Sequence, residues 1–134
     1  MQLRSKLPDV GVTIFGKMSK MAQDHGAINL SQGFPDFEVA PELIDRVTHY
    51  MKVGNNQYPP MPGVPDLRNA ITKKIKRSYD TQVHPDQVLV TCGAIEAIFN
   101  TIMSLIHQGD EVIIMNPAYD AYEVIINLQG AKAV

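Results

Sequence analysis

The C-terminal part of the sequence alternates short apolar segments with segments of helical periodicity, and this alternation restricts the fold more than any other feature. Extended segments are predicted at residues 87–92, at 111–115 and from about residue 131. The helices between them are predicted to run from Ile95 to the Gly109-Asp110 pair and from about Tyr119 to Leu128. Nearly continuous apolar strands joined by helical crossovers are typical of a parallel sheet with helices on both faces. The sequence therefore predicts an α/β fold with a parallel-type sheet and flanking helices.

The N-terminal part of the chain is predicted to be less regular. Gly and Pro interrupt residues 31–37 and again residues 54–63, so both segments are expected to be loops. Helices are predicted over residues 12–24, from Pro41 onward, and from Val64 to Tyr79-Asp80. The helix that begins at Pro41 carries an apolar stripe that we expect to be buried, made of Leu43, Ile44, Val47, Tyr50 and Met51.

Composition and charge exclude several classes of partner. Of the 134 residues, 45% are hydrophobic and 19% charged, with a formal net charge of −2, so neither nucleic acid nor an anionic membrane surface is an expected partner. The one basic cluster, which comprises Lys73, Lys74, Lys76 and Arg77, is expected to be the solvated face of a helix. No apolar stretch approaches the roughly 20 residues needed to span a bilayer, and the N-terminus does not resemble a signal peptide.

The single cysteine, Cys92, excludes an internal disulfide and is consistent with a reducing compartment, so we expect a cytoplasmic protein. Because Cys92 ends an apolar segment, a buried and unreactive thiol is the expectation. The four histidines show no spacing typical of a metal site, and no metal site is predicted. They are His25, His49, His84 and His107.

The loop after the first predicted strand is a candidate anion site. Thr91 to Glu96 pass directly from strand to helix through Gly93, and a helix N-terminus that follows such a turn favours an anion. The loop lacks the Gly-Lys-Ser/Thr of a Walker sequence and the further glycines of a dinucleotide fingerprint. Junctions of this kind are common, so a tight turn without a ligand explains the same residues more often than an anion site does.

The loop after the next predicted strand, residues 116–122, carries Tyr119 and Tyr122. Since ligands bind at the carboxyl ends of parallel strands, an aromatic ring is expected at the same sheet edge as the anion site. A flat ring beside a phosphate cradle suits a planar, phosphorylated ligand. The alternative is that both tyrosines are ordinary packing residues.

Four segments together resemble the class I/II pyridoxal-phosphate-dependent aminotransferases of fold type I, most closely the branch that contains kynurenine, glutamine and methionine aminotransferases. These segments are Asn29 to Phe37, Asn56 to Gly63 with Leu67-Arg68, Val90 to Ala97, and Gly109 to Tyr122. They follow the family's order and spacing and cover nearly the whole chain. Each segment is unspecific by itself, whereas the set is specific.

The resemblance implies roles for five residues toward pyridoxal 5'-phosphate. Gly93, Ala94 and Ile95 would present backbone amides to the phosphate, and Tyr119 would stack on the pyridine ring. Tyr58 would reach across a homodimer interface to the cofactor phosphate of the neighbouring subunit.

The resemblance also implies a substrate contact and a domain division. The backbone of Gly33 would lie against the carboxylate end of an amino acid or 2-oxo acid substrate. Residues 1–40 would form an N-terminal arm and part of a small domain, and residues 41–134 the first part of the large cofactor-binding domain.

The family's catalytic residues have no counterpart in this sequence. The lysine that forms a Schiff base with the cofactor, the residues at O3′ and the ring nitrogen, and the arginine for the substrate carboxylate would all follow Val134. None of the lysines present matches the Schiff-base motif; they are Lys6, Lys17, Lys20, Lys52, Lys73, Lys74, Lys76 and Lys132. We therefore expect the N-terminal portion of an aminotransferase, inactive by itself, with no catalytic residue of its own.

Two other interpretations stay open at this point. A carbon–sulfur lyase or another fold type I enzyme shares the architecture. A non-catalytic module that binds a phosphorylated ligand or a partner is the alternative outside enzymes.

Overall fold

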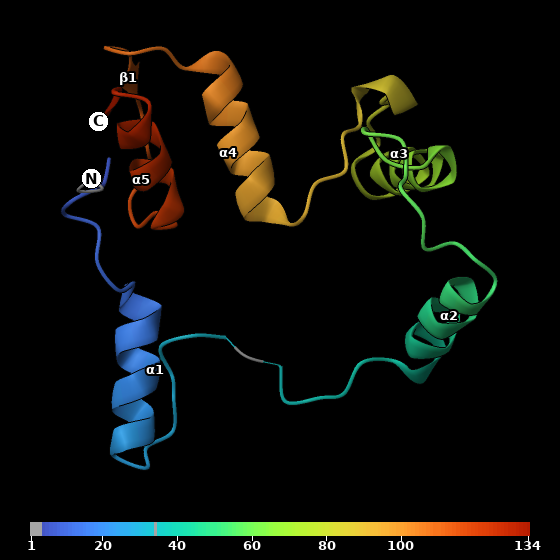
Figure 1. Ribbon diagram of the computed structural model, residues 1–134, viewed down its shortest axis with the longest axis horizontal. Helices are drawn as coiled ribbons and strands as arrows, with labels where there is room; N and C mark the ends of the chain where they lie inside the picture. The colour runs from blue at the N-terminus through green and yellow to red at the C-terminus, as the bar shows by residue number, and fades with distance from the viewer. Residues whose placement is uncertain (1–3, 34) are drawn as a thin grey trace. The chain divides into compact units, whose positions relative to one another are not determined.

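The computed structural model describes residues 4–33 and 35–134 and divides into two compact units (Figure 1). One unit combines the N-terminal segment up to position 34 with Gly93–Val134, and the other is Pro35–Cys92. The first unit contains the sheet and two helices that pack on each other, so it contains the part of the chain for which an α/β fold is predicted.

The sheet consists of two parallel strands, β1 (Glu111–Val112) and β2 (Lys132–Ala133). Glu111 pairs with Lys132 and Val112 with Ala133. The Lys132 amide donates to the Asp110 carbonyl at 2.8 Å, and the Ile114 amide donates to the Val134 carbonyl at 2.9 Å, so the pairing continues beyond both assigned strands. The prediction of a parallel-type α/β fold is confirmed.

The small core of this unit lies between the second strand and the helix that precedes it. Helix α4 (Ala94–Leu105) contacts α5 (Ala121–Leu128), and α5 contacts β2. Ile125 and Ile126 of α5 are 6% and 1% exposed, and Ala131, just before β2, is 8% exposed. Both helices were expected from their apolar spacing, and both are present.

The N-terminal helix of the same unit, α1 (Ile14–Asp24), agrees with the prediction for residues 12–24. It begins after Thr13, whose Oγ1 accepts a hydrogen bond from the Gly16 amide at 3.2 Å. Such a cap satisfies one of the amides that the first helical turn leaves without a partner in the helix. The chain then turns back, and the Asn29 side-chain amide donates to the Ser19 hydroxyl at 3.0 Å.

The second unit contains α2 (Pro41–Lys52), α3 (Pro65–Tyr79) and the short 3-10 helix η1 (Pro85–Gln87). Both α-helices have Pro in the first turn, where its missing N–H costs nothing, as expected for their starts. α3 contacts η1. The left-handed backbone of Asp80, with φ 52°, ends α3.

Two predictions about strands are wrong in detail. Residues 88–92 are extended but are not assigned as a strand, because the Val90 amide donates to the Pro62 carbonyl at 3.0 Å rather than to a neighbouring strand. The expected cover on both faces of the sheet is also absent from the described part of the chain. Ile113 and Met115 are 83% and 87% exposed, whereas Val112 and Ile114, on the alternate face, are partly buried.

Two predictions about burial are also wrong. The apolar stripe of α2 is exposed, since α2 makes no extensive contact with another helix or strand among the described residues. Cys92 is exposed because the extended segment that it ends has no sheet around it. None of the helices in residues 4–33 and 35–134 has the length and apolar character needed to cross a membrane.

Candidate functional site

The turn into α4 has the local geometry expected of an anion cradle. Gly93 is the residue before the helix, with φ 99° and ψ 174°, a conformation that strains any residue with a Cβ atom. The Ala97 amide donates to the Gly93 carbonyl at 3.3 Å, so the helix begins directly at Ala94. A Cβ atom built on Gly93 would meet no atom within 4 Å, so there is room for a ligand to approach the backbone.

The first turn of α4 also supplies an electrostatic preference. The aligned peptide dipoles of a helix place partial positive charge at its N-terminus, and this end attracts phosphate. No side chain caps α4 at Gly93, and its neighbours Ala94 and Ile95 carry small or apolar side chains. Glu96 contributes a negative charge in the same turn. The helix dipole and the backbone amides therefore favour an anion, whereas the Glu96 carboxylate opposes it, and no cationic side chain lies in this turn.

A cavity of about 510 Å³ joins this turn to the second predicted site loop. Ile95 from α4 and Tyr119 from the loop before α5 both line it. Tyr119 is 40% exposed and meets Tyr122 edge to face, with ring centroids 5.9 Å apart. Volumes of about 300–1,000 Å³ are typical of small-molecule sites. The structure thus brings Ile95, one of the three predicted phosphate contacts, to the cavity of the predicted ring contact Tyr119, whereas Gly93 and Ala94 do not line this cavity.

The other residues that line this cavity were not predicted from the sequence. Part of the lining comes from the N-terminal segment, namely Val10, Gly11, Thr13 and Ile14. The rest comes from the start and buried side of α5, namely Asp120, Ala121, Val124 and Ile125. Residues 10–14 carry no motif, and their apolar character in an irregular segment is the only signal that could have indicated a role.

The wall of this cavity carries little charge. Asp120 is the one charged residue among those that line it in the described part of the chain, and no lysine, arginine or histidine takes part. The cavity therefore offers an aromatic face and apolar walls, but no amine or imidazole for acid–base chemistry. Among the described residues there is likewise no group of His, Cys, Asp and Glu that could hold a metal ion.

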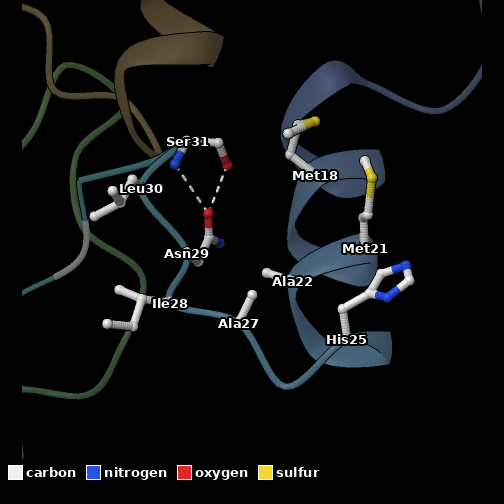
Figure 2. A pocket seen from close by; sticks show the side chains of 9 residues that line it. All are labelled: Met18, Met21, Ala22, His25, Ala27, Ile28, Asn29, Leu30 and Ser31. Atoms are coloured by element: carbon white, nitrogen blue, oxygen red, sulfur yellow. Dashed lines mark hydrogen bonds between the residues drawn. The ribbon is translucent and has the colours of Figure 1, made fainter.

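Gly33 lies elsewhere in the same unit. A second cavity, of about 480 Å³, lies between α1 and residues 27–31, and Figure 2 shows it from close by. Gly33 comes after these residues in the chain and is not among those that line this cavity. There the Asn29 side-chain oxygen accepts hydrogen bonds from the Ser31 amide at 3.0 Å and the Ser31 hydroxyl at 2.6 Å (Figure 2). Gly33 is exposed and does not line the Tyr119 cavity, so the structure does not bring it to the other predicted residues.

Tyr58 belongs to the other unit, in the loop between α2 and α3. Its side chain is 100% exposed. The role predicted for it, a contact with the cofactor of a neighbouring subunit, stays a prediction.

Comparison with known proteins shows which family the chain resembles. The family described as "Aminotransferase class I and II" matches residues 25–134. A methionine aminotransferase of Escherichia coli K12 is 50% identical over 128 residues, which are 95% of this chain and 33% of that protein.

Two crystal structures are also similar. A methionine aminotransferase from Escherichia coli superposes with a TM-score of 0.92 at 47% identity, over 100% of this chain and 35% of that one. An N-succinyldiaminopimelate aminotransferase from Mycobacterium tuberculosis superposes with a TM-score of 0.89 at 38% identity, over 99% of this chain and 35% of that one. The chain thus spans about a third of the length of the relatives that it matches.

Proposed function

Because the chain belongs to the class I and II aminotransferases, we propose that it is the N-terminal part of an enzyme that transfers an amino group from an amino acid to a 2-oxo acid. The observation that carries this proposal is the shared cavity of Ile95 and Tyr119, beside the strained turn at Gly93. Tight turns alone explain Gly93, and packing alone explains Tyr119. Neither explains why Ile95, two residues after Gly93, and Tyr119 border one cavity of ligand size.

Enzymes of this family depend on pyridoxal phosphate. The residues present fit that group at two points. The open space at Gly93 and the dipole of α4 suit the phosphate, and the Tyr119 ring beside Ile95 suits the flat pyridine. When bound, the cofactor supplies the electron sink and the temporary carrier of the amino group.

The proposed work of this chain is to bind and orient the cofactor. Gly93, Ala94 and Ile95 hold the phosphate with backbone amides, where the lack of a Cβ on Gly93 permits close approach. Tyr119 restricts the tilt of the ring by stacking on it. Proton transfer belongs to residues outside these 134, since the cavity wall has no lysine or histidine.

The apolar wall supports a preference among amino donors. A carboxylate on the side chain of the donor would be desolvated against Ile14, Val124 and Ile125 and would face Asp120 rather than a cation. We therefore propose donors with uncharged, apolar side chains, and methionine fits this description. Aspartate is expected to be a poor donor for the same reason.

Three further features belong to the same proposal. Gly33 lies near the substrate carboxylate in the complete enzyme, and Tyr58 reaches the phosphate site of the second subunit of a homodimer; the full exposure of Tyr58 is compatible with this role. Residues 1–40 belong to an arm and small domain, and residues 41–134 to the large domain. The proposed location is the cytoplasm, supported by the single cysteine.

The test uses the longer polypeptide, with this chain at its N-terminus, supplied with pyridoxal phosphate. Methionine or aspartate is offered with a panel of 2-oxo acids, and the new amino acid is measured. We expect amino transfer with methionine at a kcat/KM at least about tenfold above that with aspartate. Release of ammonia and a free thiol from a sulfur-containing donor, without amino transfer, would instead identify a carbon–sulfur lyase. Absence of both reactions, with the cofactor bound, would contradict the proposal.

A further inference from the structure

We propose that Gly63 and Arg68 are positioning residues for the cofactor: they clamp the segment that leads into the Gly93 turn against the start of α3. This inference rests on the function proposed above and deepens it. The clamp lies wholly within the Pro35–Cys92 unit. Its influence would pass through the backbone that joins Val90 to Gly93.

The first half of the clamp is a close backbone approach at Gly63. This glycine is buried and has φ 104°. A Cβ atom built on it would lie 2.6 Å from Val90 Cγ2 and 3.0 Å from Val90 Cβ. The Val90 amide also donates to the Pro62 carbonyl at 3.0 Å. Val90 is thus held by its side chain and its backbone against the same turn.

The second half is the guanidinium of Arg68. The Arg68 side chain is only 13% exposed, although most side chains of this unit are exposed. Nε donates to the Pro85 carbonyl at 2.9 Å, and Nη2 donates to the same carbonyl and to Asp86 Oδ1, the latter at 3.0 Å. A planar guanidinium fixes direction as well as distance, which an ammonium group does not. Arg68 therefore fixes the start of the segment, as Gly63 fixes its middle.

These contacts bear on the cofactor because the segment is short. Only two residues separate Val90 from Gly93, and an extended chain covers only about 3.3–3.6 Å per residue. A Cβ atom at Gly63 would displace Val90, which is joined to the turn by this short segment. Errors of about 1 Å in the placement of binding groups can cost about 100-fold in rate.

The experiment uses the longer polypeptide and measures the Kd of pyridoxal phosphate by absorbance titration. Gly63→Ala is expected to raise this Kd at least about tenfold. Gly54→Ala is the matched control, since Gly54 has φ 91° in the same unit but no atom within 4 Å of an added Cβ. The control also has a positive φ but lacks the collision, and its Kd is expected to stay near that of the parent.

Rescue distinguishes positioning from loss of stability. Val90→Ala removes the methyl group that an alanine at position 63 would strike, so the double variant Gly63→Ala/Val90→Ala is expected to recover much of the lost affinity, although its core is smaller. Arg68→Lys keeps the charge and is expected to weaken cofactor binding about threefold to tenfold, whereas Arg77→Lys, at the end of α3, is expected to change nothing.

Each outcome decides the matter. If the parent protein binds no pyridoxal phosphate, the proposed function fails before any variant is made. If the parent binds it and Gly63→Ala and Arg68→Lys bind equally well, only the clamp is overturned. The clamp is also overturned if the double variant is weaker than Gly63→Ala. Should Gly63→Ala not fold, the comparison of Arg68→Lys with Arg77→Lys carries the test.

Discussion

Ile95, in the first turn of α4, and Tyr119, in the loop before α5, border the same cavity although they belong to different connections of the chain. The sequence pattern predicts this meeting, since successive loops of a parallel arrangement emerge at one edge of the sheet, although the segment before α4 is not a strand of the observed sheet. The cavity joins a surface suited to phosphate with one suited to a planar ring. The following predictions test that arrangement, in the longer polypeptide unless stated otherwise.

Replacement of Tyr119 should separate stacking from hydrogen bonding. Tyr119→Phe keeps the ring, and we expect its Kd for pyridoxal phosphate to stay within about threefold of the parent. Tyr119→Ala removes the stacking face and should raise the Kd about tenfold or more. Absorbance titration measures both. Equal affinity of the alanine variant and the parent would exclude a role for the ring.

Gly93→Ala should weaken cofactor binding more than it weakens the fold. The added Cβ meets no protein atom, so the cost in unfolding free energy is that of φ 99°, about 1–2 kcal/mol. The same Cβ occupies the space that the phosphate needs, so the Kd should rise by more than tenfold, a factor equivalent to about 1.4 kcal/mol. Gly109→Ala is the control, since Gly109 has φ 89° and equally open surroundings. It should lose similar stability while keeping cofactor affinity.

The core of the α/β unit depends on Ile126, which is 1% exposed. Ile126→Ala should lower the unfolding free energy by about 2–5 kcal/mol through lost burial and a cavity. Urea unfolding followed by circular dichroism measures the change. In the 134-residue chain, Ile113→Ala should cost less than about 0.5 kcal/mol because Ile113 is 83% exposed. A loss at position 113 as large as that at 126 would contradict the described burial.

The end of α3 offers a test of backbone strain. Asp80 has φ 52°, and its carboxylate pairs with Lys76 on an exposed surface. Asp80→Gly should stabilise the unit by about 0.5–1 kcal/mol, since glycine adopts the left-handed conformation without steric cost and the exposed ion pair contributes little. Asp80→Ala should destabilise it. Thermal unfolding compares both variants with the parent, and an Asp80→Gly variant less stable than the parent would show that the ion pair outweighs the strain.

The 134-residue chain itself should bind an environment-sensitive apolar dye and show no amino transfer. Its exposed apolar side chains include the stripe of α2 and Ile113 and Met115 beside β1, and the chain spans about a third of its relatives. Dye fluorescence and an aminotransferase assay with methionine check this. Amino transfer by the short chain would contradict our assignment of the proton-transferring residues to the rest of the protein.

The sequence predicts helices here better than it predicts burial. Apolar spacing and the prolines at positions 41 and 65 locate α2 and α3, because helices form from local contacts. The same spacing predicts a buried face for α2 that lies exposed, since burial requires a second surface that the described chain does not supply. Residues 88–92 are extended without being a strand for a related reason: a strand needs a partner, and Val90 pairs with Pro62 instead.

In the candidate site, too, some residues could be predicted from the sequence and others could not. The meeting of Ile95 and Tyr119 could be predicted because both follow predicted parallel segments, and chain topology brings such loops together. The contribution of Ile14 and its neighbours could not, because it depends on where an irregular segment lies against α5. Neither could the Gly63–Val90 approach, which depends on a distance between two side-by-side backbones that no local pattern encodes.

A crystal structure of the longer protein with pyridoxal phosphate tests the central claim most directly. Our account predicts the phosphate within about 3 Å of backbone nitrogens in the turn from Gly93 to Ile95, with the pyridine ring stacked on Tyr119. A cofactor bound at a different turn, or a ring that Tyr119 does not contact, would contradict it.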